Sequence, residues 1–191
     1  MAKQFPALEP GHAAFIAGQK IFFSGSAAAT GRINVSPKGM DALRILTPNR
    51  VCYLDLTGSG NETAAHNLAD GRLTLMFCGS EGAPQILRLY GRSTILRRGG
   101  SEYERILDEA YRGAEIAGAR QIVVLDFDLV QTSCGYAVPL FDYRDDRRTL
   151  VRWAEARESG EGLDAYRRAN NSRSIDGFPT GMFDEEIEAA E

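Results

Sequence analysis

The sequence predicts a mainly β fold with accompanying helices, built as an antiparallel barrel or sandwich. Short β-type runs recur between about residue 20 and residue 98, and turn residues separate them. Tight turns join these runs, which is typical of antiparallel strands rather than of repeated βαβ units. The composition, with 191 residues of which 43% are hydrophobic and 25% charged, is that of one globular domain.

The elements are expected in the following order. Residues 10–20 form a short helix with Phe15 and Ile16 facing inward. Strands are expected at residues 21–25, 32–36, 43–46, 51–56, 72–78, 85–96 and 120–132. Helices interrupt them at 60–69 and 101–112. Ser59 and Glu62 have the spacing of a capping box before the first of these helices, and Ser101 is the expected N-cap of the second.

Single residues within the strands add detail. Residues 51–56 are apolar on both faces apart from Asp55, which predicts a central strand. Gly91, inside the long run 85–96, predicts a bulge or a bend at a barrel corner. Cys52 and Cys78 lie in apolar runs, where we expect them to be small buried hydrophobic residues.

The chain after residue 139 is charged and weakly periodic. We expect helices near 145–158 and 161–170 and a frayed acidic tail at 183–191. The whole chain, residues 1–191, is therefore interpreted as one domain. It would consist of a barrel core at about 10–140, a helical C-terminal extension at about 141–182, and the tail.

Charge and composition exclude several classes of protein. A net charge of −4 argues against a protein that coats nucleic acid, because phosphate contacts need a basic surface. The apolar runs are too short to span a membrane, and the first residues lack the apolar core of a signal peptide, so we expect a cytoplasmic protein. Three Cys and two His signal neither a disulfide framework nor a metal site, and His12 is expected to be structural or exposed.

The first stretch with possible chemistry is residues 31–39, GRINVSPKG. Alternation places Ile33 and Val35 on one face of a strand and Arg32, Asn34 and Ser36 on the other. A strand with one face in water gives the same pattern. The alternative is a ladder of hydrogen-bonding groups suited to a heteroaromatic edge or a phosphate. A proline then ends the pairing, and a lysine follows on a tight turn.

The second stretch is residues 57–63, TGSGNET, between a central strand and a helix. A glycine-rich loop before a helix exposes unpaired N–H groups at the positive end of the helix dipole, where anions bind. It lacks the Lys of a Walker loop and the third Gly of a dinucleotide fingerprint. An ordinary capped turn explains it equally well. If a phosphate binds here, its charge would be neutralised by Arg32, Lys38, Arg50 or Arg88.

The third stretch is residues 130–135, VQTSCG, a compact polar cluster at the end of a strand. Nothing near Cys134 in the sequence would activate its thiol as a nucleophile. With only His12 and His66 available, no hydrolytic triad or paired acid–base site is indicated. Donors, hydroxyls and an anion-binding helix end without a catalytic base are typical of a protein whose chemistry is carried by a phosphorylated cofactor.

These three stretches, VSPKG, LTGSGNETAAH and VQTSCG, resemble the pyridoxamine 5'-phosphate oxidase-like family of FMN-binding split barrels, over roughly residues 10–140. The resemblance implies a six-stranded antiparallel split barrel flanked by helices. It further implies a homodimer with FMN at the subunit interface, and an FMN-dependent oxidoreductase that acts with a small-molecule substrate or electron donor.

The resemblance also implies which residues hold the cofactor. In the family, the strand that matches residues 32–37 lines the flavin, and its leading Arg meets the phosphate. The strand-to-helix segment that matches residues 53–63 adds flavin and phosphate contacts. A late Gln-Ser pair, similar to Gln131 and Thr132 here, completes the site. The corresponding residues of this chain are Arg32, Ile33, Asn34, Val35, Ser36, Lys38, Tyr53, Ser59, Asn61, Thr63, Gln131, Thr132 and Ser133.

This chain departs from the family pattern at two places. The Arg-Lys pair that holds the phosphate in the oxidases is replaced near Thr63 and Ala64 by uncharged residues, and their C-terminal Trp and Arg motif has no counterpart in residues 140–191. Vitamin B6 oxidation is therefore not the expected activity. Alternatives on the same fold are a non-catalytic flavin or haem binder and a deazaflavin-dependent reductase.

Overall fold

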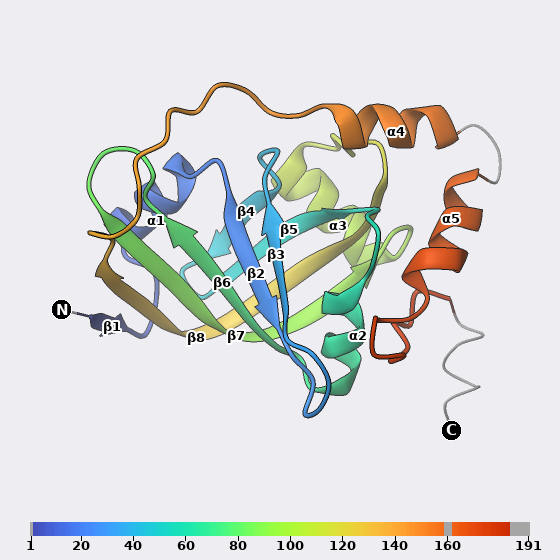
Figure 1. Cartoon of the computed structure of the whole chain (residues 1–191), viewed down its shortest axis with the longest axis horizontal. Helices are drawn as coiled ribbons and strands as arrows, with labels where there is room; N and C mark the ends of the chain where they lie inside the picture. Colours follow the sequence, from blue (N-terminus) through green and yellow to red (C-terminus); the bar gives the residue numbers. More distant parts are fainter. Residues whose placement is uncertain (1, 159–161, 184–191) are drawn as a thin grey trace.

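A computed structural model describes residues 2–158 and 162–183. The elements follow one another along the chain as β1 (Lys3–Phe5), α1 (Pro10–Gly18), β2 (Phe22–Ser26), β3 (Asn34–Lys38), β4 (Leu43–Thr47), β5 (Arg50–Leu56), α2 (Glu62–Ala69), β6 (Arg72–Cys78), β7 (Gln85–Arg97), α3 (Ser101–Tyr111), β8 (Ala119–Cys134), α4 (Thr149–Glu158) and α5 (Gly162–Asn171). The mainly β prediction is confirmed, and β1 is a strand that the sequence did not predict (Figure 1).

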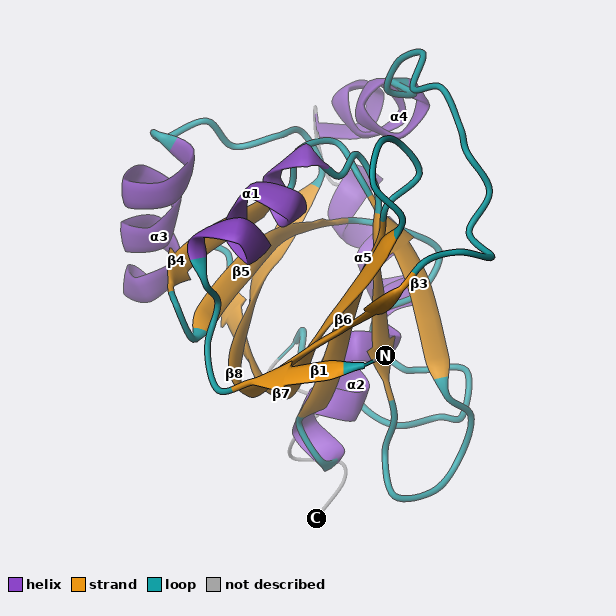
Figure 2. Cartoon of the chain, turned by 90° about the vertical axis from the view of Figure 1, so that its left-hand side faces the viewer, coloured by secondary structure: helices purple, strands orange, loops and turns teal. Residues whose placement is uncertain are grey.

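All strand pairs are antiparallel and belong to one curved sheet with the order β3-β2-β6-β7-β8-β5-β4, and β1 pairs with β8. In the described part of the chain the sheet has eight strands, where the resemblance implies six. It curls round on itself, as the view along its axis shows (Figure 2), and β3 and β4 form its two edges. The sheet is therefore a barrel that stays open between these edge strands.

Two apolar clusters hold the sheet in shape. The first fills the inside of the barrel with side chains such as Tyr53, Leu75 and Leu89, and α1 packs onto it through Ile16. The second lies on the outside, where α3 covers β5 and β8 and buries Tyr103. Val51–Leu54 are all at most 1% exposed, because β5 lies between β8 and β4 and is covered on both faces. The predicted central position of this strand is confirmed.

The strand predicted at 32–36 is shifted: β3 begins at Asn34 and runs through Pro37 to Lys38. The prediction that Pro37 ends the pairing is wrong, because Pro37 lies opposite Phe23 inside the strand. Pro cannot donate a backbone hydrogen bond, but β3 is an edge strand with one neighbour, so one side of the strand needs no donor.

Both predicted helix caps are corrected by the structure. Helix α2 begins at Glu62 with Asn61 as N-cap, and Ser59 and Glu62 form no capping box. Both oxygens of the Glu62 carboxylate instead accept the N–H of Ile175 at 3.1 Å, a contact across 113 residues that local spacing cannot predict. The N-cap of α3 is Gly100 rather than Ser101, which is the first residue of the helix.

Gly91 lies at an irregularity in the pairing of β7 with β8. The register between β7 and β8 shifts at Tyr90/Gly91, which confirms the predicted bulge. A Cβ added at Gly91 would lie 2.0 Å from the Asp126 carbonyl oxygen. Only glycine lets the two backbones approach this closely.

The C-terminal part of the chain returns to the barrel. Helices α4 and α5 form as expected near 145–158 and 161–170, and the segment after α5, residues 172–182, runs along the N-terminal end of α2 (Figure 1). We call residues 172–182 the C-terminal strap. Most of the predicted acidic tail, residues 184–191, lies outside the described residues. Among the described helices, none is long and apolar enough to cross a membrane.

Candidate functional site

The opening of the barrel contains a cavity of about 740 Å³ between β3 and the end of β5. The pairing of β4 with β5 ends at Leu43 and Tyr53, followed by one hydrogen bond from the Leu54 N–H to the Ala42 carbonyl, so Asp55 and Leu56 have no paired strand on that side. The loop after β5, α2, α5 and the C-terminal strap complete the walls. The polar and charged residues that line the cavity are Asn34, Ser36, Lys38, Asp55, Ser59, Glu62, Thr63, Arg120, Asn170, Arg173 and Ser174.

Strand β3 turns its polar row toward this cavity. Asn34, Ser36 and Lys38 line the wall, while Val35 on the opposite face is 64% exposed. The interpretation of the polar row as a strand face in bulk water is therefore wrong. Water contacts the apolar face of β3 in the single chain, and the hydrogen-bonding face points inward.

The row is held in place by hydrogen bonds among its own members and α2. Ser36 Oγ donates to Asn34 Oδ1 at 3.0 Å, and Asn34 Nδ2 lies 3.3 Å from Ser26 Oγ and 3.4 Å from Thr63 Oγ1. Ser26 Oγ is in turn 3.0 Å from Nδ1 of the buried His66. Because Ser36 uses its proton on Asn34, its oxygen offers an acceptor to the cavity.

Asp55 is the charged centre at the back of the site. Its carboxylate is buried and accepts hydrogen bonds from Lys38 Nζ at 2.6 Å, Arg120 Nε at 2.8 Å and Gln121 Nε2 at 2.9 Å. Burial by itself would raise the pKa of the Asp55 carboxyl, but the charges of Arg120 and Lys38 outweigh it and hold that pKa well below its usual range. One carboxylate between two cations leaves a net positive charge at this wall.

Arg32, expected at the phosphate, is engaged elsewhere. Its backbone N–H donates to Asp176 Oδ2 at 2.6 Å, and its guanidinium forms an ion pair with the same carboxylate. Asp176 belongs to the C-terminal strap. The pKa of the Asp176 carboxyl is lowered, mainly by the hydrogen bond from the Arg32 backbone N–H. Arg32 and Ile33 precede β3 and are not among the residues that line the cavity.

The residues expected on the strand-to-helix segment fall into two groups. Ser59 and Thr63 line the cavity. Asn61 and Tyr53 are buried behind it: Asn61 Oδ1 accepts Gln121 Nε2 at 2.8 Å, and Lys38 Nζ lies 5.6 Å from the centre of the Tyr53 ring. Burial raises the pKa of the Tyr53 hydroxyl.

The late cluster, residues 131–133, is not brought to this cavity within one chain. Gln131 and Ser133 lie on the outer face of the sheet, where Tyr90 Oη is 3.4 Å from Gln131 and Arg88 reaches Ser133 at 3.3 Å. Thr132 alternates with them and shares the inward face of Val130. The structure thus places the three predicted residues on both faces of β8, away from Lys38 and Ser59.

Arg120 and the C-terminal residues are the functional candidates that sequence reasoning missed. Arg120 is the second residue of β8 and is buried, and Arg173 reaches the cavity from the strap. One signal for Arg120 was present in the sequence. Asp55, a lone carboxylate in an apolar central strand, requires a buried cation as its partner.

The residues present fit the phosphate and the ring edge of a flavin nucleotide. Hydroxyls of Ser59 and Thr63, the ammonium of Lys38 and the N-terminal end of α2 are donors of the kind that phosphates bind. The buried Asn61 Nδ2 at the N-cap, behind the cavity wall, has no acceptor among the described residues. The volume is within the usual range for small-molecule sites.

Comparison with known proteins identifies the relatives of this chain. The model of the pyridoxamine 5'-phosphate oxidase family matches residues 8–134. A member of that family from Aspergillus flavus, ustO, is 37% identical over 176 residues, which cover 84% of this chain and 70% of that protein.

Solved structures share the fold. HupZ from Group A Streptococcus superposes with a TM-score of 0.53 at 16% identity, over 64% of this chain and 91% of HupZ. A protein from Lactobacillus delbrueckii assigned to the pyridoxamine 5'-phosphate oxidases gives 0.51 at 16% identity, over 66% and 94% of the two chains. The extent of the family match, together with the ustO likeness, shows that this chain belongs to the pyridoxamine 5'-phosphate oxidase family.

Proposed function

We propose that this protein binds FMN in the cavity between β3 and the end of β5 and works as an FMN-dependent oxidoreductase. The observation that carries the proposal is the inward row Asn34, Ser36 and Lys38, which faces the loop and the N-terminal end of α2 across one cavity. The family membership supports the same cofactor. The substrate class is a small molecule, and a cytoplasmic location remains a prediction.

Different residues of the cavity would contact different parts of the cofactor, according to their chemistry. Ser59, Thr63 and the first turn of α2 would hold the phosphate, with Lys38 supplying its countercharge. Asn34 and Ser36 would meet the edge of the ring, where the Ser36 oxygen accepts a ring N–H. Bound FMN supplies the electron transfer, and the chain fixes its orientation and excludes water from one face.

The binding test starts from the purified full-length chain and its visible spectrum. We expect a flavin absorption band that is retained on gel filtration, and a higher melting temperature when FMN is added to the apoprotein. A colourless protein that FMN does not stabilise would overturn the proposal. Parallel titrations with haem and a deazaflavin compare the alternative ligands, and tighter binding of either would assign the site to that ligand instead.

The catalytic part is tested on the FMN-loaded protein. NADH and NADPH are supplied under argon, and the flavin band at the visible maximum should bleach and return when oxygen is admitted. A flavin that binds tightly but is reduced by neither NADH nor NADPH at a useful rate would assign the chain to the non-catalytic binders.

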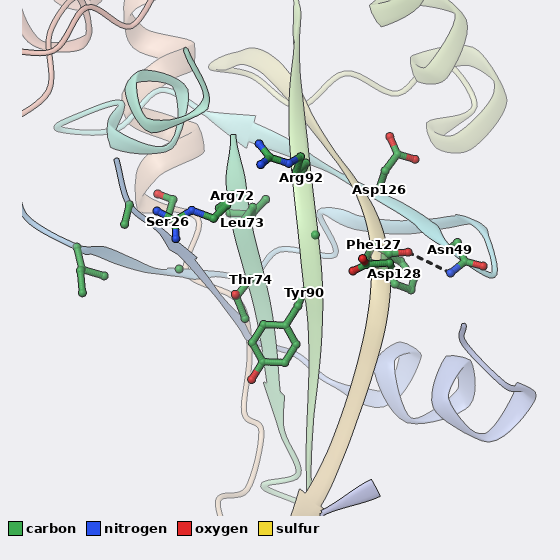
Figure 3. Close-up of a pocket in the computed structure, with 14 residues that line it drawn as sticks. Ser26, Asn49, Arg72, Leu73, Thr74, Tyr90, Arg92, Asp126, Phe127 and Asp128 are labelled. Atoms are coloured by element: carbon green, nitrogen blue, oxygen red, sulfur yellow. Dashed lines mark hydrogen bonds between the residues drawn. The ribbon is translucent and has the colours of Figure 1, made fainter. Parts of the chain in front are cut away.

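The homodimer is proposed on the outer face of the sheet, which no described helix covers at its centre (Figure 1). Cross-strand neighbours form two rows on this face, as the pairing shows. The first row is Val35, Gly25, Thr74, Tyr90 and Leu129, and the second is Pro37, Phe23, Met76, Arg88 and Gln131. Thr74 and Tyr90 stand side by side in the shallow concavity of this face (Figure 3).

The chemistry of these rows favours a protein partner over water. The second row begins with Pro37, Phe23 and Met76, and the first row carries Val35, Tyr90 and Leu129 beside it. Apolar side chains gathered on an uncovered face are typical of interaction sites. Gln131 belongs to the second row of this face, so it would lie at the interface of such a dimer and not in the cavity of its own chain. We therefore propose that any cofactor contacts of VQTSCG are made across the dimer.

A further inference from the structure

Helix α5 is fixed to the candidate site by the buried guanidinium of Arg167. Its Nε donates to Thr57 Oγ1 at 2.9 Å, its Nη2 to the Ala119 carbonyl at 2.9 Å, and its Nη1 to Asp164 at 2.9 Å. The Arg167 side chain is 9% exposed, while that of Asp164 is 70% exposed. The strong contacts of Arg167 are therefore those to Thr57, just after β5, and to Ala119, the first residue of β8.

One turn later, Asn171 makes the second connection. This fully buried amide accepts Arg120 Nη1 at 2.9 Å through its Oδ1 and donates to the Gly58 carbonyl at 3.0 Å through its Nδ2. Arg120 Nη1 also donates to the Gly60 carbonyl at 2.9 Å. The loop between β5 and α2 is thus held at Thr57, Gly58 and Gly60 by polar groups from α5 and β8.

The first residue of the loop is also held from just before β8, because the Thr57 N–H and Oγ1 both donate to the Gly118 carbonyl at 2.8 Å. The contacts from Asn171 and Arg120 therefore matter most for residues 58–60. A Cβ added at Gly58 would meet no atom within 4 Å, so side-chain packing does not restrain the backbone there. A buried guanidinium is costly, and an apolar replacement of similar shape often stabilises a protein as well or better. Stability alone therefore explains the buried Arg167 and Asn171 poorly. Directed hydrogen bonds are, however, what holds a glycine-rich loop in one conformation.

The strap continues the same attachment on the far side of the cavity. Glu62, the first residue of α2, accepts the Ile175 N–H, and the next residue, Asp176, binds Arg32 in front of β3. Between these contacts, Arg173, Ser174 and Ile175 form part of the cavity wall. The C-terminal extension is consequently attached to the loop, to α2 and to the β3 entrance.

We propose that Arg167 and Asn171 are positioning residues for the phosphate of the cofactor. They hold loop 57–60 in the conformation that presents Ser59 and the N-terminal end of α2 to a phosphate. This inference rests on the proposed function, because it concerns how the same cavity binds FMN. Helix α5 lies outside the segment that the family model matches, and the inference gives this helix a role in building the site.

The test compares FMN with riboflavin, which has the same ring and no phosphate. The variants are Arg167→Met and Asn171→Leu, which keep size and remove the hydrogen bonds, and Asn171→Asp, which keeps the acceptor for Arg120 but loses the donor to Gly58. Arg168→Met is the matched control, because this arginine of the same helix is exposed and its guanidinium lies over the Phe183 ring, at 4.3 Å from its centre. Affinities are measured by flavin fluorescence quenching, and folding of each variant by circular dichroism and melting of the apoprotein.

We expect Arg167→Met and Asn171→Leu to weaken FMN by about tenfold or more while riboflavin changes little, so that the preference for FMN falls. Asn171→Asp should fall in between, and Arg168→Met should match the wild type. Equal losses for FMN and riboflavin, or an unchanged preference, would overturn the inference and leave FMN binding intact. Failure of the wild-type chain to bind FMN would instead overturn the proposed function.

Hydrogen exchange of the wild-type chain gives a measurement that needs no variant. FMN should slow exchange of the amides in loop 57–61 and in α5 together, because one network joins them. Protection of the loop with no change in α5 would contradict the inference even if every substitution prevented folding.

Discussion

Arg120 Nε donates to Oδ2 of Asp55 at 2.8 Å, and the two side chains are only 5% and 3% exposed. The pair joins the start of β8 to the end of β5 behind the candidate site. Lys38 reaches the other oxygen of the same carboxylate from β3, so Asp55 connects the two sides of the barrel opening.

Asp55→Asn should therefore destabilise the protein strongly. The amide cannot neutralise two cations, and leaving a buried charge without its partner costs about 3–5 kcal/mol. We expect a loss of this size in urea unfolding at pH 7, with Asp126→Asn, at an exposed ion pair, as the control that loses less than about 1 kcal/mol. Equal losses in the two variants would contradict the role given to Asp55.

The same comparison should depend on pH. In the unfolded chain Asp55 titrates near its ordinary value of about 3.9, whereas in the folded chain its pKa is lower. As pH falls, the unfolded state therefore binds the proton first. Ionised Asp55 contributes its full share to the free energy of unfolding above the pKa of the unfolded chain, and this contribution is lost as pH falls to the lower pKa of the folded chain. The stability difference between wild type and Asp55→Asn should be constant from about pH 5 to pH 7 and shrink below about pH 4.

Lys38→Met tests the countercharge of the phosphate. Lys38 lines the cavity and its side chain is 22% exposed, so it can reach a ligand while it contacts Asp55. FMN should bind about tenfold more weakly, with a smaller dependence on salt, and riboflavin should be nearly unaffected. Lys20→Met, a lysine outside this cavity, is the control; a normal FMN affinity in Lys38→Met would place the phosphate elsewhere.

Gly91→Ala tests the close approach of β7 and β8. The added Cβ would meet the Asp126 carbonyl oxygen at 2.0 Å, so the strands must separate at the bulge. We expect a loss of about 3 kcal/mol in chemical unfolding. Gly11→Ala in α1, where the Cβ meets nothing within 4 Å, should be neutral or slightly stabilising, and the same outcome for Gly91→Ala would show that the bulge relaxes freely.

Val35→Asp tests the proposed dimer face. A carboxylate at Val35, the end of the row that continues through Gly25 and Thr74, would have to be buried on assembly. Sedimentation should show a dimer for the wild type and a monomer for the variant. Tyr136→Asp, which introduces the same charge at a side chain that is 83% exposed and lies outside the face, should remain dimeric. A dimeric Val35→Asp protein would place the interface elsewhere.

The sequence by itself determined the fold class, most of the helices and strands, and which side chains share one face of a strand. Period-two alternation showed that Asn34 and Ser36 share one face of a strand, and Gly91 marked the bulge, because both are properties of neighbouring residues in a backbone with known geometry. The glycine-rich loop before α2 was recognisable for the same reason, and its residues Gly58, Ser59 and Gly60 line the cavity.

The tertiary structure alone decided which face of β3 is the inner one and which charges pair. Alternation is symmetric between the two faces, so it could not show that the polar row points inward. Arg32 meets Asp176 across 144 residues, and Arg167 meets Thr57 across 110. Such partners are set by how the C-terminal extension returns to the barrel. Because ion pairs and hydrogen bonds act over a few ångströms in space rather than along the chain, the sequence predicted the polar wall of the site but not the residues that hold it in place.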